Sequence, residues 1–409
     1  MGLFDVDDYI EERNSYLEDY SKGLELISKV LGRNKINKVE KINIDKINTV
    51  LDRDLLRAFK NVQLTNEMEI YTKLTDLSDK ISEQNKVKLL NDRTIIGIGG
   101  KFSSGKSKFI NSLLDDDILP EKQNPTTSIP TYIISNENDT IKALTFNNME
   151  IELDLEAMQA LTHEFYEKYN IGFSSFIKNL IIQSKNMMYK NIAFLDTPGY
   201  TKYDLDSKKS ISDEEKARLH LKASDYVIWL VDAENGEISQ KDIEFLKSIA
   251  IETKVLVVFN KADKKTENDI YSIVKNSENT LNVHGIKYFG VTAYSALDGE
   301  EYLGNKKIEE FLNEAQNYKN SKENIEKQIN DILSLLEKQI NDIENKSIER
   351  RNKLGNIIFK SDEFIEIKTL TKMYSDSMDY LRDINKCKRN FKQIKSTIKS
   401  LLDEYFERR

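Results

Sequence analysis

The chain is poor in cysteine and proline, and its acidic residues outnumber its basic ones. Of its 409 residues only Cys387 is a cysteine and four are prolines, and Lys and Arg (61) are outnumbered by Asp and Glu (69), which gives a net charge of −8. A single cysteine excludes an internal disulfide and a cysteine zinc site, as is typical of a reducing cytosol. The acidic balance argues against nucleic acid or an anionic membrane surface as the main partner.

Long apolar runs are absent as well. No run approaches the roughly 18 residues of a membrane-spanning helix. The N-terminus has neither the pattern of a signal peptide nor a convincing myristoylation site, because Met1-Gly2 is not followed by Ser or Thr at position six. We therefore expect a cytoplasmic protein, with peripheral attachment to a membrane as an open alternative.

Proline and glycine are concentrated in the middle of the chain. All four prolines lie between Pro120 and Pro198, and eleven of the fifteen glycines lie between Gly97 and Gly304. Because both residues interrupt helices, the flanks should be helical. We predict an N-terminal helical segment at 1–90, an α/β domain at 91–305 and a C-terminal helical segment at 306–409. The α/β domain should contain a mostly parallel sheet with helices on both faces.

In the flanks, apolar residues recur at helical spacing. The N-terminal flank has three such stripes, at 10–31, 44–62 and 70–81. A helix with one apolar face must bury it, so we expect these stripes to pack on one another. The C-terminal flank has an eleven-residue apolar repeat at 325–343, which is typical of a long, nearly straight helix. Its last stripe, at 387–401, runs beside a row of lysines, which indicates either a solvated face or a surface for a membrane or a partner.

The middle of the chain alternates apolar strands with helical runs. The predicted strands are 94–98, 131–134, 140–146, 180–183, 192–195, 226–231, 255–259 and 288–291. Several are continuous apolar runs, as expected of strands that are buried on both faces.

The segment Gly100–Ser107 reads GKFSSGKS and fits the phosphate-binding pattern of glycine, four residues and Gly-Lys-Ser. In such a loop, backbone N–H groups and a helix N-terminus bind phosphate. Lys106 would then reach the β- and γ-phosphates, and the hydroxyl of Ser107 would bind Mg²⁺. The nucleotide-binding residues predicted here are Gly100, Lys101, Phe102, Ser103, Ser104, Gly105, Lys106, Ser107 and Lys108.

Two further signals concern Mg²⁺ and the γ-phosphate. The loop Pro120–Pro130 contains Thr127, which we prefer over Thr126 as a Mg²⁺ ligand that senses the γ-phosphate. The segment Asp196-Thr197-Pro198-Gly199 follows a predicted strand. There Asp196 would hold Mg²⁺ through water, and the N–H of Gly199 would face the γ-phosphate.

Two last signals concern the base. In Asn260-Lys261-Ala262-Asp263, Asp263 can accept two hydrogen bonds from the guanine edge, Asn260 can fix the loop and the stem of Lys261 can cover the base. A site built on such paired polar groups rejects a base that lacks the partner by roughly 10⁴–10⁵-fold, which favours GTP over ATP. The backbone at Ser295, with Thr292-Ala293 as a rival, would meet the guanine oxygen. All these motifs follow predicted strands, and ligands of such sheets bind beyond the carboxyl ends of the strands.

In this order, GKFSSGKS, the Pro-Thr-Thr loop, DTPG and NKAD resemble the GTPase domain of the dynamin superfamily, especially that of bacterial dynamin-like proteins. The resemblance covers about residues 90–300. It implies hydrolysis of GTP to GDP and phosphate, stimulated when two such domains pair across the nucleotide, and flanking helices that form a neck bundle or stalk. Tyr200 stands where Ras-like proteins carry a water-orienting glutamine. Ser103 matches the dynamin side chain that helps to place water and a cation, so the predicted catalytic residues are Ser103, Lys106 and Thr127.

The resemblance also implies GTP or GDP and Mg²⁺ as cofactors, with K⁺ or Na⁺ as a further cation. Its implied partners are a second copy, a second dynamin-like subunit or a membrane, although no apolar lipid-binding tip stands out in the sequence. Two alternatives come from other classes. A ribosome- or RNA-associated GTPase would need a basic RNA-binding module, and a GTP-gated coiled-coil scaffold would bind GTP with little turnover.

Overall fold

The computed structural model divides into two compact units, Met1–Val39 with Lys86–Asn320 and Glu40–Asn85 with Ser321–Arg409. It describes residues 14–31, 44–86, 90, 93–119, 129–146, 149–161, 163–173, 176–197, 213–249, 254–304, 306–318, 322–361 and 363–407.

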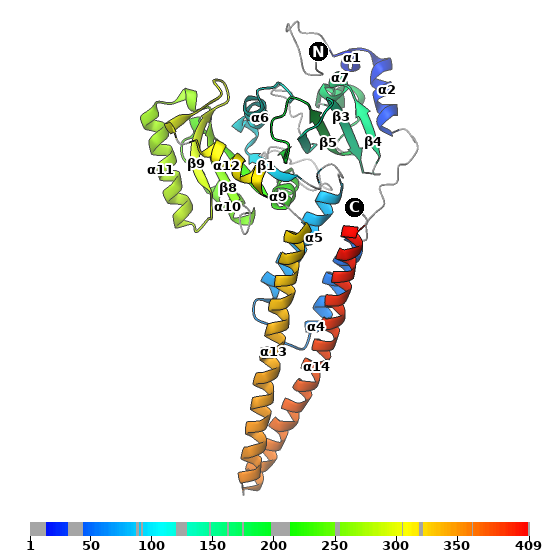
Figure 1. The fold of residues 1–409 in the computed structure, drawn as a ribbon, viewed down its shortest axis with the longest axis vertical. Coiled ribbons are helices and arrows are strands. Elements are labelled where there is room, and N and C mark those ends of the chain that lie inside the picture. The colour runs from blue at the N-terminus through cyan, green and yellow to red at the C-terminus, as the bar shows by residue number, and fades with distance from the viewer. Residues whose placement is uncertain are drawn as a thin grey trace. The chain divides into compact units, whose positions relative to one another are not determined.

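Within the described residues, the first unit is built on a ten-stranded, mostly parallel sheet, part of which is labelled in Figure 1. The strand order is β10-β9-β8-β7-β1-β6-β2-β5-β3-β4. Strands β9, β8, β7, β1 and β6 are parallel, whereas β2 pairs with β6 in the antiparallel direction. The strands are β1 Thr94–Gly100, β2 Thr131–Ser135, β3 Thr140–Thr145, β4 Glu150–Leu153, β5 Ile177–Ser184, β6 Ile192–Asp196, β7 Tyr226–Asp232, β8 Lys254–Asn260, β9 Gly290–Ser295 and β10 Glu300–Glu301. The predicted α/β fold class is confirmed.

Alternate residues of the central strands face different helices. In β7, Tyr226 and Leu230 belong to a core shared with α6 and α12, whereas Trp229 and Val231 belong to a core shared with α9, α10 and α11. This alternation follows from the two-residue period of a strand, and it explains why the strand is apolar throughout. The helices of this unit are α1 Ser15–Glu18, α2 Tyr20–Leu31, α6 Lys106–Leu114, α7 Leu155–Gln159, α8 His163–Tyr169, α9 Asp213–Ala223, α10 Gln240–Ile249, α11 Glu267–Val283 and α12 Lys307–Asn317.

Some predicted strand boundaries need correction. The last long strand, β9, spans Gly290–Ser295 instead of 288–291, because its pairing with β8 begins at Gly290. The short strands β4 and β10 are not predicted by the sequence. Both lie at the edges of the sheet, where backbone pairing on one side needs no continuous apolar run.

The first N-terminal stripe packs on the sheet unit, whereas we expected it to pack on the other two stripes. Leu26, Ile27 and Val30 of α2 share a core with residues of α7 and α8. A Cβ at Gly23 would lie 2.1 Å from the hydroxyl of Tyr169, so the glycine allows the tyrosine ring to lie against the helix. Helix α12, beyond the predicted boundary at 305, also packs on this unit.

The second unit is a set of helices around one apolar core. It contains α3 Ile44–Thr49, a π-helical stretch Val50–Leu55, α4 Leu56–Phe59, α5 Glu67–Lys86, α13 Lys322–Lys360 and α14 Phe364–Glu407. The expectation that the second and third stripes pack together is confirmed for the side chains that the structure describes. These are Ile47, Leu51, Leu55, Ala58, Val62, Ile70, Leu74 and Leu77.

Helices α13 and α14 lie side by side as a long hairpin (Figure 1). Both predicted C-terminal stripes contribute to its core, the repeat through Ile329, Leu336 and Ile340 and the last stripe through Cys387, Phe391, Ile394 and Ile398. Two lysines of the basic row pair across the hairpin. Lys388 Nζ lies 2.5 Å from Glu344 Oε2, and Lys395 Nζ lies 2.6 Å from Glu337 Oε2.

The closed end of the hairpin exposes large apolar side chains. Phe359 is 92% exposed, and Phe364 and Ile365 are each 80% exposed. We call these three residues the hairpin tip. None of the helices, within their described residues, is both long and apolar enough to cross a membrane.

Candidate nucleotide-binding site

The phosphate loop lies between β1 and α6, as its sequence pattern predicts. β1 ends at Gly100, a short 3₁₀ turn covers Phe102–Ser104, and α6 begins at Lys106. Gly100 and Gly105 have φ values of 143° and 79°. A Cβ at Gly100 would lie 2.4 Å from the carbonyl oxygen of Leu230, so only glycine fits there. The N-terminus of α6 therefore follows this glycine turn directly, and a helix N-terminus favours a bound anion.

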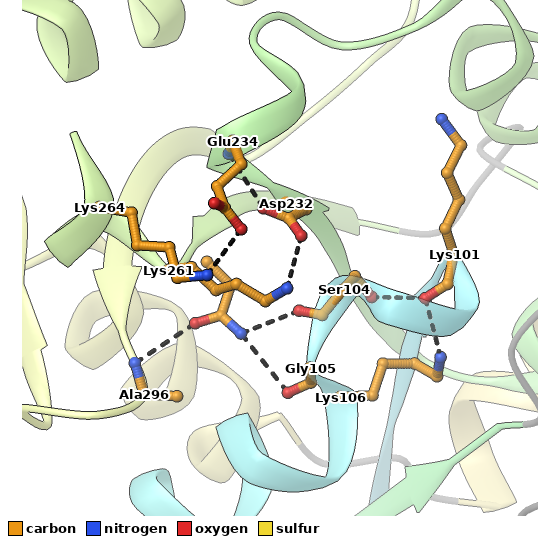
Figure 2. A network of polar contacts seen from close by, with 10 residues as sticks. Lys101, Ser104, Gly105, Lys106, Asp232, Glu234, Lys261, Lys264 and Ala296 are labelled. Carbon is orange, nitrogen blue, oxygen red and sulfur yellow. Dashed lines mark hydrogen bonds and ion pairs between the residues drawn. The ribbon is translucent and has the colours of Figure 1, made fainter. Parts of the chain in front are cut away.

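The amine of Lys106 is buried inside this loop. Lys106 Nζ donates to the carbonyl oxygen of Gly100 at 3.3 Å. It also donates to the carbonyl oxygen of Lys101 at 3.2 Å (Figure 2). Burial lowers the pKa of Lys106, and the nearby carboxylate of Asp196 partly offsets this effect. A phosphate would supply the negative charge that these neutral carbonyls lack.

Ser107 and Asp196 form the candidate Mg²⁺ position. Ser107 Oγ donates to Asp196 Oδ2 at 3.0 Å, and Asp196 Oδ1 is buried without a hydrogen-bond partner. Burial raises the pKa of Asp196 to about 6, although Lys106 and Ser107 act in the opposite direction. A hydroxyl beside a carboxylate with one unsatisfied oxygen fits a hard, oxygen-binding cation. Within the described residues, no three His, Cys, Asp or Glu side chains form a metal cluster, and Mg²⁺ usually takes its remaining ligands from phosphates and water.

Asn260 connects the phosphate loop to the predicted base-binding loops. It is the last residue of β8, and its Nδ2 donates to the carbonyl oxygen of Ser104 at 2.9 Å. Its Oδ1 accepts a hydrogen bond from the backbone N–H of Ala296 at 3.3 Å. Since Asn260 is 1% exposed, these bonds replace those it would make with water. Three separate loops are thereby held at one edge of the sheet.

Asp263 and Ser295 lie together at the same edge. The hydroxyl of Ser295 lies 3.0 Å from Asp263 Oδ1 and 2.9 Å from Asp298 Oδ2, so its single proton can serve either carboxylate. Ser295 is the last residue of β9. The rival residues Thr292 and Ala293 lie inside this strand, and Ser295 is therefore the one at the carboxyl end, where the other motifs lie.

The remaining predicted residues fall into two groups. Thr126, Thr127, Gly199 and Tyr200 lie outside the described residues. Ser103 is exposed on the 3₁₀ turn, Phe102 is 41% exposed beside it, and Lys108 is half-buried in the first turn of α6. Phosphate-loop residues Lys101, Ser104 and Gly105 belong to the polar network of Figure 2.

Sequence reasoning missed three residues that hold the lysines of this site. Asp232 Oδ2 lies 2.6 Å from Lys261 Nζ. Asp242 Oδ2 and Ser239 Oγ lie 3.1 and 2.8 Å from Lys101 Nζ. Only Asp232 had a usable signal, because an acidic residue directly follows the apolar run of β7.

Comparison with known proteins identifies the region that carries these motifs. Residues 96–262 match the family model described as "Dynamin family". Dynamin-like protein 1 of Campylobacter jejuni subsp. jejuni serotype O:23/36 (strain 81-176) is 23% identical over 350 residues, which cover 72% of this chain and 47% of that protein. An uncharacterised protein in the xynA 3′ region of Caldicellulosiruptor sp. (strain Rt8B.4) is 23% identical over 279 residues, 65% of this chain and 66% of that protein. This chain thus spans about half the length of the first relative and about two thirds of the second.

Among solved structures, a chain of an oligomerised bacterial dynamin pair matches with a TM-score of 0.39 and 19% identity. The match covers 96% of this chain and 72% of that chain. Era of Aquifex aeolicus bound to GDP·AlF₄⁻ matches with a TM-score of 0.34 and 19% identity, over 56% of this chain and 58% of that chain.

Proposed function

The chain belongs to the dynamin superfamily, and from this premise we propose that it binds GTP and GDP with Mg²⁺ and hydrolyses GTP. The observation that carries the proposal is the convergence of four motifs at the carboxyl ends of β1, β6, β8 and β9. Strands β1, β6, β8 and β9 run in the same direction, so these ends lie at one edge of the sheet.

Lys106, Ser107 and Asp196 are the proposed phosphate and metal residues. Lys106 would leave the carbonyls of its own loop and pair with the β- and γ-phosphates, and the N-terminus of α6 would face the same anions. Ser107 and Asp196 would hold Mg²⁺, Asp196 through a water molecule. Bound there, Mg²⁺ would neutralise charge that develops on the phosphates.

Asp263 is the proposed guanine-reading residue. Its carboxylate can accept hydrogen bonds from the ring N–H and the exocyclic amine of guanine, whereas adenine presents no such pair of donors. Asn260, which already joins the phosphate loop to the Ala296 backbone, would keep this carboxylate at a fixed distance from the phosphates. Lys261 would cover the base.

Competition binding tests this assignment. A fluorescent GDP analogue should be displaced by GTP and GDP but not by ATP. In Asp263→Asn the amide presents an N–H group where the carboxylate would accept a hydrogen bond from guanine. The affinity for guanine nucleotides should therefore fall at least about tenfold, and the affinity for xanthine nucleotides should rise. Displacement by ATP as efficient as by GTP would exclude a guanine site. Asp298→Asn, which changes the other carboxylate beside Ser295, is the matched control and should retain the preference for guanine.

For hydrolysis, we propose Ser103 as the residue that helps to place the attacking water and Thr127 as the Mg²⁺ ligand that senses the γ-phosphate, with stimulation when two G domains pair across the nucleotide. Two exposed apolar side chains support such pairing, Phe102 in the phosphate loop (41% exposed) and Leu297 in the turn after β9 (68% exposed). Ser103 is itself exposed on this edge. A K⁺ or Na⁺ ion near Ser103 is part of the same proposal.

We also propose that the helical unit associates with a membrane through the hairpin tip. Phe359, Phe364 and Ile365 lie on both sides of the turn between α13 and α14. Between residues 349 and 372 basic residues outnumber acidic ones, with Arg350, Arg351, Lys353, Lys360, Lys368 and Lys372 against Glu349, Asp362, Glu363 and Glu366. Exposed aromatic and aliphatic side chains among cations suit the interface of an anionic lipid surface.

A further inference from the structure

The segment that leads from β7 into α10 carries three carboxylates that each pair with a lysine of a nucleotide loop. We call residues 232–242 the acidic segment. Its ion pairs are Asp232–Lys261 (2.6 Å), Glu234–Lys264 (2.7 Å) and Asp242–Lys101 (3.1 Å). Two of these lysines follow Asn260, and the third is in the phosphate loop. One short segment thereby contacts both halves of the site.

Its contact with the phosphate loop is made through Lys101. The carbonyl oxygen of Lys101 accepts from the Ser104 backbone N–H (3.1 Å), from Ser104 Oγ (2.8 Å) and from Lys106 Nζ (3.2 Å). The side chain leaves the loop on the other side (Figure 2) and ends on Asp242, whose own side chain is only 2% exposed. The residue that shapes the loop is thus anchored to α10.

Its contact with the base-binding loop is made through Lys261. This residue has a φ of 62°, in the left-handed region that a lysine rarely adopts. Its amine pairs with Asp232, of which 8% of the side chain is exposed, and Asp232 also accepts from the backbone N–H of Glu234. Figure 2 shows Lys261, Asp232, Glu234 and Lys264 as one connected group. The ion pair holds the side chain that follows Asn260 in the chain.

The third pair differs from the other two in its exposure. In Glu234–Lys264 both side chains are 47% exposed. An ion pair in water contributes little, because solvent screens it. Glu234 therefore provides an internal control within the same segment.

We propose that the acidic segment positions the two halves of the nucleotide site relative to each other. Asp242 holds the phosphate loop through Lys101, and Asp232 holds the base-binding loop through Lys261. Both carboxylates act through a lysine and are positioning residues. This inference rests on the proposed function, because it assigns a role to groups that surround the proposed GTP site.

The two halves make different predictions for kinetics. Asp242→Asn should lower kcat for GTP about tenfold with a smaller change in KM, because the loop that places Lys106 and Ser103 loses its anchor. Asp232→Asn should lower the affinity for GDP and for GTP equally, by about tenfold, because it disturbs base binding. It should leave kcat at saturating GTP within twofold of wild type.

Two variants serve as controls. Glu234→Gln should stay within twofold of wild type in both kcat and affinity. Lys101→Met combined with Asp242→Asn should be no worse than Asp242→Asn alone.

Thermal melting of each variant separates positioning from a general loss of structure. The proposal expects melting temperatures close to that of wild type and the stated split between kcat and affinity. Parallel loss of kcat, affinity and melting temperature would overturn the proposal. It would also be overturned if the variants of Asp232 and Asp242 behaved like Glu234→Gln.

Binding of a fluorescent GDP by wild type separates this inference from the proposed function. If the wild-type chain itself fails to bind a fluorescent GDP, the proposed function fails, and this inference fails with it. If wild type binds and the split is absent, only this inference fails.

Discussion

At the scale of single residues, the site combines two buried charges that water no longer solvates. Lys106 is 6% exposed and Asp196 is 1% exposed. Burial lowers the pKa of the amine and raises that of the carboxyl to about 6, although each attracts the other. Burying a carboxylate with an unpaired Oδ1 costs free energy. The free chain therefore contains a position that a cation and a phosphate would stabilise.

This argument predicts a pH-dependent effect of Asp196→Asn in the absence of nucleotide and Mg²⁺. The pKa of Asp196 rises from 3.8 to about 6 on folding, so the folded state binds the extra proton between these values. The buried carboxylate of Asp196 therefore destabilises the folded wild-type chain fully above about pH 6. Below about pH 4, where Asp196 is protonated in both states, it has no such effect. The melting temperature of the variant relative to wild type should increase from pH 5 to pH 8 by a few degrees, corresponding to about 1–3 kcal/mol. A difference that is constant across this range would contradict the assignment.

At the scale of elements, the sequence predicts what local patterns determine. GKFSSGKS requires glycine at Gly100 and Gly105. Apolar runs predict strands that end at Leu195 and Phe259, each one residue before the observed end of β6 or β8. It does not predict which distant element packs on α2, or that Asp242 would meet Lys101 across 141 residues. Such contacts depend on the tertiary fold. The sequence does not predict the hairpin tip for the same reason. Whether an apolar residue of a helix is exposed depends on which elements pack against it.

The helical hairpin allows a test of its packing by mutation. Phe391 is 2% exposed, and the centroid of its ring lies 5.9 Å from the ring centroid of Phe59. Phe391→Ala should cost about 3–5 kcal/mol, since it leaves a cavity in the core. Leu335→Ala, at a position that is 48% exposed, should change stability by less than about 0.5 kcal/mol.

The single tryptophan makes this test specific to one unit. Trp229 lies in β7 of the sheet unit, and the chain has no other tryptophan. In urea, Phe391→Ala should move the far-ultraviolet circular dichroism transition of the helices to lower concentration and leave the Trp229 fluorescence transition in place. Equal shifts of both signals would mean that the two units unfold together.

At the scale of the whole molecule, the proposed pairing of G domains connects hydrolysis to concentration. Specific GTP turnover should rise as the protein concentration passes through the dimerisation range. Leu297→Ser should remove this rise and retain the basal rate of dilute protein, because Leu297 is exposed at the proposed contact and makes no proposed contact with the nucleotide. Val283→Ser, at an apolar position that is 84% exposed on α11, is the control. A specific rate that stays flat across concentration in wild type would exclude stimulation by pairing.

The hairpin tip gives the chain a second surface whose function can be measured apart from the nucleotide. Wild-type protein should sediment with vesicles that contain anionic lipid, more weakly with neutral vesicles, and less at high salt. Replacing Phe359, Phe364 and Ile365 by serine should abolish sedimentation without changing nucleotide affinity, because burial of these side chains in the interface supplies the apolar part of the binding free energy. Serine at Phe146, Met188 and Val283, which are 58%, 70% and 84% exposed in the sheet unit, forms the matched control and should sediment normally. If the triple variant still sediments with vesicles, the membrane contact lies elsewhere. If wild type does not sediment with GTP, with GDP or with a non-hydrolysable analogue, membrane association is removed from the proposed function.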